Sequence, residues 1–207
     1  MTSEAIRDPL TDHLLTPRNA AFVIIDYQPV QVASIRSMDQ DELVFNIVHT
    51  TKAALNYKLP IVLSTVNVAS GRNKPTITPL QELLNGVPSY DRTTINAWED
   101  MEFRKSVEAT GRRKLIMAAL WTEACLSFPA LDALREGYEV YAVADAVGGT
   151  SRTAHETALR RIEQAGAILI SKTQLYCELQ RDWNRSATVP GFMDVFQNFD
   201  GSNPEKK

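Results

Sequence analysis

One stretch of the chain passes from a buried-strand pattern directly into a helix pattern, and this constrains the fold most. Residues 114–119 form a short, mainly apolar run. The pattern breaks at Trp121-Thr122, and apolar residues then recur at helical spacing from Glu123 onward. Cys125 is therefore expected in the first turn of a helix that follows a strand. Free backbone N–H groups and the positive end of the helix dipole meet there, so we expect this thiol to ionise more readily than a free one.

The rest of the chain repeats the same alternation of strand and helix. The apolar runs predict further strands over residues 20–26, 60–66, 138–144 and 167–170, and residues 89–92 are expected to form a short strand as well. Helical spacing predicts helices over residues 39–55, 80–85, 100–111, 123–137 and 153–166. Runs that are apolar on both faces suit parallel strands covered by helices on both sides. We therefore expect an α/β fold with a mostly parallel sheet, and ligands beyond the carboxyl ends of its strands.

Two details of these helices can be predicted as well. Pro129 falls in the body of the helix over residues 123–137, where it removes one backbone hydrogen bond and should bend the axis. Thr153 and Glu156 have the spacing of a capping box at the start of the helix over residues 153–166.

Length and charge exclude several classes of protein. The 207 residues suffice for one domain, with a core over residues 18–185, an N-terminal arm over 1–17 and a C-terminal tail over 186–207. The net charge of −3 offers no basic surface for nucleic acid or an anionic membrane. The apolar runs are too short for a membrane helix, and the first residues lack a signal-peptide pattern. Two distant cysteines do not form a disulfide framework, so we expect a soluble, cytoplasmic protein.

Three chemically capable residues lie at or just beyond predicted strand ends: Asp26, Arg92 and Cys125. Each also has a plain structural interpretation. Asp26 could cap a turn, Arg92 could be a solvated surface residue, and Cys125 could be a small apolar filler. If they act together, Asp26 could accept the thiol proton.

Other polar residues give weaker indications. His13, His49 and His155 are isolated from one another and from cysteine, which argues against a zinc site and a Cys–His dyad. Gly148-Gly149 lacks the surrounding residues of a phosphate-binding motif and indicates a flexible turn. Cys177 lies in a polar segment, and we predict no role for it.

Several segments, in the same order, resemble motifs of the isochorismatase-like cysteine hydrolases. These are residues 21–28 with the first strand, 92–98 with the family's lysine segment, 121–125 with its cysteine motif, and 142–146 with the following strand and turn. The resemblance covers residues 18–185 and is closest to the YcaC-like branch. Residues 95–98, 122–123, 128–131 and 178–183 carry that finer similarity.

The resemblance implies a three-layer, Rossmann-like fold and a catalytic triad. Carried over by position, the triad is Asp26, Arg92 and Cys125. It also implies a cis peptide at Leu120–Trp121, which would aim the Ala124 and Cys125 N–H groups at an oxyanion. The substrate pocket is expected to contain the following residues: Gln28, Asn96, Trp98, Trp121 and Thr122.

The resemblance further implies a small-molecule substrate, no cofactor and a homo-oligomer, with an octamer as one expected size. Nicotinamidases of this superfamily carry an Asp-x-His metal motif after the second strand. Residues 64–68 offer no equivalent, so we predict neither that metal site nor nicotinamidase activity.

Three departures from the family pattern concern the site itself. Arg92 replaces the usual lysine and cannot release a proton at working pH. Trp121 stands where a small or aliphatic residue is usual, and Ala119 replaces a frequent glycine. We expect an unusual pocket shape.

These features favour hydrolysis of a small amide or related acyl compound through a Cys125 thiolate. Two alternatives stay open. Isochorismatase-type cleavage of a vinyl ether need not use a cysteine, and a binding or assembly protein could keep the fold with a vestigial site.

Overall fold

Six parallel strands form the central sheet of the computed structural model, which describes residues 7–197. They are β1 (Ala20–Ile25), β2 (Ile61–Val66), β3 (Ser89–Arg92), β4 (Lys114–Ala119), β5 (Glu139–Val143) and β6 (Ile168–Ile170). Their order is β3-β2-β1-β4-β5-β6, and every neighbouring pair is parallel. The predicted strands and the mostly parallel sheet are therefore confirmed.

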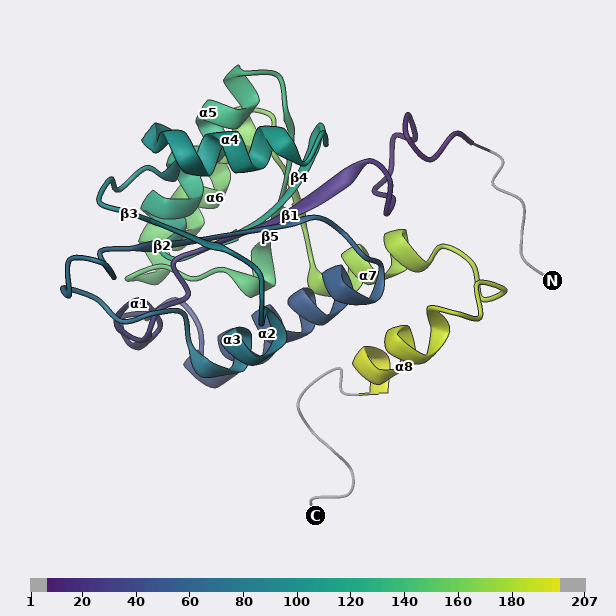
Figure 1. Ribbon diagram of the computed structural model, residues 1–207, viewed down its shortest axis with the longest axis horizontal. Helices are drawn as coiled ribbons and strands as arrows, with labels where there is room; N and C mark the ends of the chain where they lie inside the picture. The colour runs from purple at the N-terminus through teal and green to yellow at the C-terminus, as the bar shows by residue number, and fades with distance from the viewer. Residues whose placement is uncertain (1–6, 198–207) are drawn as a thin grey trace, which may run out of the picture.

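Helices cover both faces of the sheet, as the apolar runs predicted (Figure 1). One face carries α2 (Gln40–Asn56) and α3 (Thr78–Leu83), and the other carries α4 (Met101–Ala109), α5 (Ser127–Arg135) and α6 (Arg152–Gln164). Three short turns complete the layers: η1 (Ala97–Glu99), the π-helical turn η2 (Thr122–Leu126) and η3 (Ala144–Ala146). No helix within residues 7–197 is both long and apolar enough to cross a membrane.

The middle of the sheet fixes the place of the site. Every residue of β1 and of β4 is buried, because helices cover both faces. The two strands pair in register from Ala20 with Lys114 to Ile25 with Ala119. The chain turns to one side of β1 for β2 and to the other side for β4, so the strand order reverses between them. Segments that follow β1 and β4 consequently meet at this switch point.

The structure refines one sequence prediction about helices and contradicts another. The π turn η2 runs directly into α5, which begins at Ser127, so Pro129 lies in the first turn of α5 and inside a continuous helical stretch. In α6 the cap is Ser151, whose side chain accepts a hydrogen bond from the Ala154 N–H, and not Thr153.

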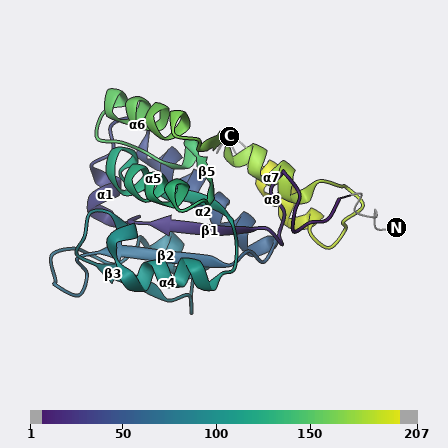
Figure 2. The same cartoon turned by 90° about the horizontal axis from the view of Figure 1, so that it is seen from above.

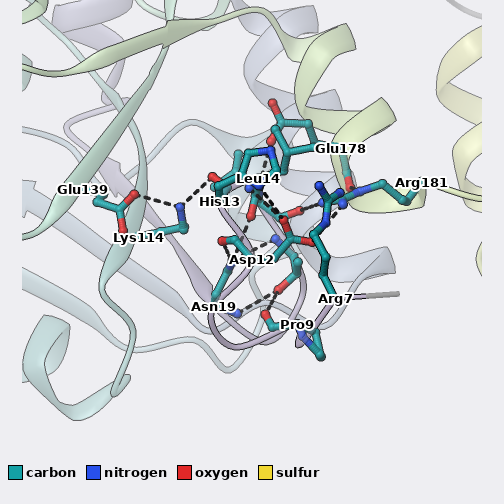
Figure 3. A network of polar contacts seen from close by, with 12 residues as sticks. Arg7, Pro9, Asp12, His13, Leu14, Asn19, Lys114, Glu139, Glu178 and Arg181 are labelled. Carbon is teal, nitrogen blue, oxygen red and sulfur yellow. Dashed lines mark hydrogen bonds and ion pairs between the residues drawn. The ribbon is translucent and has the colours of Figure 1, made fainter. Parts of the chain in front are cut away.

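The N-terminal arm and the helices α7 (Lys172–Gln180) and α8 (Val189–Gln197) lie at the opposite end of the strands from α1 (Pro29–Ala33) (Figure 2). Asp12 is buried and bonds to Arg181 at 2.9 Å. The Lys114 ammonium donates to the His13 carbonyl at 2.9 Å and to Glu139 at 2.8 Å (Figure 3). These contacts tie the arm to β4, β5 and α7. Residues 1–6 of the predicted arm and 198–207 of the predicted tail lie outside the described residues.

Candidate active site

Asp26 follows β1 in the left-handed backbone region, with φ of 62°. Few non-glycine residues adopt this conformation, and aspartate is among those that tolerate it. Its N–H donates to the Ser64 carbonyl at 3.0 Å, so the turn stays attached to β2. The side chain is fully buried at the switch point.

Arg92 ends the edge strand β3 and reaches across β2 to Asp26. Its Nη1 lies 2.7 Å from Asp26 Oδ1, and its Nη2 lies 2.7 Å from Oδ2. Nη1 also donates to Ser64 Oγ at 3.1 Å, and Nη2 donates to the Ile95 carbonyl at 3.2 Å. The Arg92 side chain is fully buried, so the solvated-surface interpretation is wrong.

The Asp26–Arg92 pair is a two-pronged ion pair out of contact with solvent. Burial by itself lowers the pKa of Arg92, but the hydrogen bonds and charge of Asp26 raise it overall. Arg92 therefore keeps its proton, as arginine does generally in proteins. Only a guanidinium can bind both carboxylate oxygens in this planar geometry, and a lysine at this position could not. Within residues 7–197 the Nε of Arg92 has no acceptor.

Cys125 lies in η2, directly after β4, and is 8% exposed. Burial raises the pKa of the Cys125 thiol to about 12, and the charge of Asp26 and a hydrogen bond to its carboxylate act in the same direction. The Arg92 charge and the Trp121 backbone N–H lower the pKa, but by less. The prediction of an easily ionised thiol is therefore wrong. The helix start is outweighed by desolvation and by a carboxylate within hydrogen-bond reach.

The three sequence candidates thus come together in one buried cluster. The protonated Cys125 thiol can donate to Asp26, and Arg92 balances the carboxylate charge. A nucleophile within hydrogen-bond reach of a base, with the base oriented by a third group, is the usual arrangement for nucleophilic catalysis.

The turn that carries Cys125 is anchored on the loop after β5. The peptide Leu120–Trp121 is cis, which confirms the expectation from the family resemblance. The Thr122 N–H donates to the Gly148 carbonyl at 2.9 Å. Thr122 Oγ1 also lies 2.8 Å from His155 Nδ1. Burial lowers the pKa of His155, so its imidazole is neutral at pH 7.

A second anchor of the same turn is Glu123. Its Oε1 accepts the Thr150 N–H at 2.9 Å and the Thr150 hydroxyl at 2.6 Å. Its Oε2 packs against Gly149, where an added Cβ would lie 2.6 Å away. Glycine at position 149 therefore lets the loop approach the cysteine turn.

The two expected oxyanion donors, the N–H groups of Ala124 and Cys125, lie in this turn. The Ala124 N–H donates to the Trp121 carbonyl at 3.2 Å. The Leu126 N–H, which is not an expected donor, donates to the same oxygen at 3.1 Å. The Ala124 N–H thus has an internal acceptor in the Trp121 carbonyl.

Of the five expected pocket residues, Trp121 and Thr122 belong to the cysteine turn. Trp121 is half-buried, and its Nε1 donates to Ser34 Oγ at 2.6 Å. Gln28 is fully buried and ties β1 to β2 and the following loop, through the Val66 N–H and the Val66 and Lys74 carbonyls.

The two remaining expected pocket residues are occupied elsewhere. Asn96 caps η1 and donates to Asp132 at 2.7 Å. Trp98 is 4% exposed and packs edge-on against Phe103 and Tyr138. Both side chains join η1 to its neighbouring helices.

Sequence reasoning missed several supporting residues: Ser34, Ser64, Glu123, Thr150 and His155. Ser64 could have been found from the alternation of strands and helices, because Ser64 lies in β2, which pairs with the strand that ends before Asp26. His155 has no local signal, since its contact with Thr122 depends on how α6 packs. No group of three or more His, Cys, Asp or Glu side chains within residues 7–197 is arranged to hold a metal ion.

Known proteins resemble the chain over most of its length. Residues 20–174 match the isochorismatase domain family. The Escherichia coli (strain K12) protein named "Probable hydrolase YcaC" is 34% identical over 185 residues, which cover 89% of this chain and 88% of that protein.

Two solved structures share the fold closely. The Pseudomonas aeruginosa YcaC structure with hexane-2,5-diol and covalent acrylamide has a TM-score of 0.80 and 32% identity, covering 91% of this chain and 98% of that one. The Escherichia coli YcaC structure, described as an octameric hydrolase of unknown specificity, has a TM-score of 0.80 and 31% identity, covering 93% and 98%. The sequence motifs, the fold and these matches agree, and the chain is a YcaC-like member of the isochorismatase family of hydrolases.

Proposed function

We propose that this chain is a cysteine hydrolase that acts on a small amide or related acyl compound. The observation that carries the proposal is the placement of buried Asp26 and Cys125 directly after the paired strands β1 and β4, with Arg92 bound to both oxygens of the Asp26 carboxylate. A thiol of this kind supplies a nucleophile, and its carboxylate neighbour supplies a base.

The first half of the reaction forms an acyl-enzyme. Asp26 accepts the thiol proton while the Cys125 sulfur attacks the substrate carbonyl carbon. The Cys125 N–H stabilises the resulting oxyanion, and the Ala124 N–H joins it by sharing its bond to the Trp121 carbonyl. The tetrahedral intermediate collapses, the C–N bond breaks, and the leaving amine takes the proton from Asp26.

The second half releases the acid. Asp26 removes a proton from water, whose oxygen attacks the thioester carbon. The C–S bond breaks, and the sulfur regains a proton through Asp26. Arg92 stays protonated throughout and stabilises whichever of Asp26 and Cys125 carries the negative charge.

The raised pKa of Cys125 fits this scheme because the thiol is protonated at neutral pH. Proton transfer to Asp26 must then accompany the attack. The reactive thiolate forms only with substrate present, in a site from which water is largely excluded.

The test is a panel of small aliphatic and aromatic amides, with product acid measured and the protein digested for mass mapping. We expect turnover and an acyl adduct on the Cys125 peptide. Cys125→Ser should lose at least about a hundredfold in rate, in the range typical of general acid–base and nucleophilic contributions. Cys177→Ser, which removes the exposed cysteine, is the matched control and should keep full activity. A Cys125→Ser protein as active as the parent would end the proposal.

A binding protein whose site has no catalytic activity is the second candidate function. The observation in its favour is that Arg92 already occupies both oxygens of Asp26, where the family usually has lysine. This candidate gains if the amide panel gives no turnover and the acyl adduct is absent. Vinyl-ether hydrolysis is a separate alternative that does not need the cysteine. It would be recognised by hydrolysis of a vinyl-ether substrate that persists in Cys125→Ala.

We also propose that the chain forms a homo-oligomer in the cytoplasm. The Escherichia coli relative is described as octameric. Both cysteines are free in the structure, which suits a reducing compartment. Sedimentation velocity measures the assembly directly, and a monomer across the micromolar range would contradict this part of the proposal.

A further inference from the structure

The indole of Trp121 joins the two segments that carry Asp26 and Cys125. Its Nε1 donates to Ser34 Oγ at 2.6 Å, and Ser34 Oγ donates in turn to the Gln31 carbonyl at 2.7 Å. Ser34 belongs to the segment that continues from Asp26 through α1, and Trp121 begins the turn that carries Cys125. The ring therefore connects the segment that carries Asp26 to the segment that carries Cys125.

The backbone of the same tryptophan is fixed beside the nucleophile. Its carbonyl accepts the N–H groups of Ala124 and Leu126, the residues on either side of Cys125, and its N–H lowers the pKa of the Cys125 thiol. The backbone of Trp121 is thus bonded to the residues that flank Cys125, and its ring is bonded to Ser34.

Ser34 is itself held in place, although α1 buries none of its own residues. The next residue, Ile35, is 1% exposed and packs against Gly148. The Arg36 N–H donates to the Gly149 carbonyl at 3.0 Å, and the Gly149 N–H donates to Ser37 Oγ at 3.0 Å. The loop that anchors the cysteine turn therefore also anchors the acceptor of the indole.

From this geometry we infer that Trp121 is the specificity-determining residue of the site and that Ser34 is its positioning residue. The indole is a fixed wall beside Cys125 that admits small acyl groups and excludes bulky ones. The inference rests on the proposed function only in taking Cys125 as the nucleophile.

The test uses two alkylating reagents that differ in bulk alone. Iodoacetamide and iodoacetanilide share the reacting carbon and the iodide leaving group, and the second adds a phenyl ring on the nitrogen. In each case the sulfur forms a thioether and iodide departs. Both reagents draw on the same thiolate, so a change in the pKa of Cys125 cancels in the ratio of their rates. Cys177, which is exposed, gives the reference ratio within every protein by peptide mapping.

We expect parent Cys125 to favour iodoacetamide over iodoacetanilide by at least about tenfold relative to Cys177, as for steric exclusion from a formed pocket. Trp121→Leu should bring the ratio close to that of Cys177. Trp121→Phe and Ser34→Ala, which remove the donor or the acceptor of the 2.6 Å bond, should give intermediate ratios. Trp183→Leu, a change at an exposed tryptophan, should leave the parent ratio unchanged.

Three results would overturn parts of the inference. The indole does not exclude bulky groups if the two reagents show the same rate ratio at Cys125 and Cys177 in the parent. The same conclusion follows if the rate ratio at Cys125 in Trp121→Leu equals that in the parent. A Ser34→Ala ratio like the parent's, with Trp121→Leu altered, removes the positioning role of Ser34. Alkylation needs no turnover, so this test is independent of the proposed hydrolase activity. Failure of the hydrolase proposal would instead appear as amides that the parent does not hydrolyse, or as a Cys125→Ser protein with the activity of the parent.

Discussion

At the scale of single residues, the proposed chemistry depends on two opposite charges that act on the Cys125 sulfur. Asp26 raises the pKa of Cys125 and Arg92 lowers it, while burial adds to the effect of Asp26. The arginine in place of the family's lysine therefore does two things. It fixes the carboxylate through two 2.7 Å bonds, and it offsets part of the cost of forming a thiolate beside that carboxylate.

Substitution of the two charged partners should move Cys125 reactivity in opposite directions. Asp26→Asn removes a charge and a hydrogen bond that raise the thiol pKa, so iodoacetamide should modify Cys125 faster at pH 8 even though hydrolysis is lost. Arg92→Met removes a charge that lowers the pKa, so modification should be slower. The rate of alkylation at each cysteine, measured by peptide mapping, tests both.

These two variants control for each other. Each breaks the same buried ion pair and should cost about 3–5 kcal/mol of stability. Loss of stability alone would expose Cys125 and accelerate both reactions. Alkylation that is faster in both variants would therefore contradict the electrostatic account.

At the scale of elements, the π-helical turn that carries Cys125 depends on the loop after β5. Thr122 bonds to Gly148 and Glu123 bonds to Thr150 in that loop.

Sequence patterns located the strands and most helices, because a strand buried on both faces leaves a continuous apolar run in the sequence. They did not predict α1, whose five residues bury nothing and so leave no apolar pattern. They also merged η2 with α5, because helical spacing alone cannot separate a π turn from the α-helix that follows.

Gly149→Ala should disturb the cysteine turn. The new Cβ would lie 2.6 Å from Glu123 Oε2 and 3.1 Å from the His155 backbone, so the loop or the turn must shift. We expect a loss of about 1–3 kcal/mol in the free energy of unfolding, as for overpacking. Denaturant unfolding of the variant measures the loss.

A double-mutant cycle with Glu123→Ala isolates the contact. Removing the carboxylate relieves the shorter of the two clashes, so Gly149→Ala should cost less in the Glu123→Ala background. Strictly additive losses would show that Glu123 and Gly149 do not press on each other.

At the scale of the whole molecule, strand order decides which residues meet. Asp26, Arg92 and Cys125 are far apart in sequence, and the order β3-β2-β1-β4 brings their strand ends side by side. The alternation of strands and helices predicted a site at these ends, and the family resemblance assigned the residues. Neither could place Gln28, Asn96 and Trp98, whose hydrogen bonds and packing depend on the particular loops around them.

The opposite end of the molecule should be energetically separate from the site. Arg181→Met leaves the buried carboxylate of Asp12 without its 2.9 Å partner and should cost about 1–3 kcal/mol, as for a hydrogen bond to a charged group. Proteolysis within residues 8–14 should then become faster, while iodoacetamide modification of Cys125 stays unchanged.

Lys105→Met is the matched control for that change. It breaks an ion pair between two exposed side chains, so stability should change by no more than about 0.5 kcal/mol. Altered Cys125 alkylation in Arg181→Met would mean that the arm and the site are coupled.

The most direct measurement is the rate of Cys125 alkylation by iodoacetamide as a function of pH, in a Cys177→Ser protein. An ordinary thiol has a pKa of about 8.5, whereas burial and Asp26 raise that of Cys125 to about 12. The folded protein therefore keeps this proton where the unfolded chain loses it. The stability this provides is present below about pH 8.5 and is lost as pH rises toward 12. The predicted rate climbs about tenfold per pH unit from 7 to 10 without levelling, because the thiolate fraction keeps growing. A plateau at or below pH 8.5 would contradict the account of a thiol held protonated by Asp26.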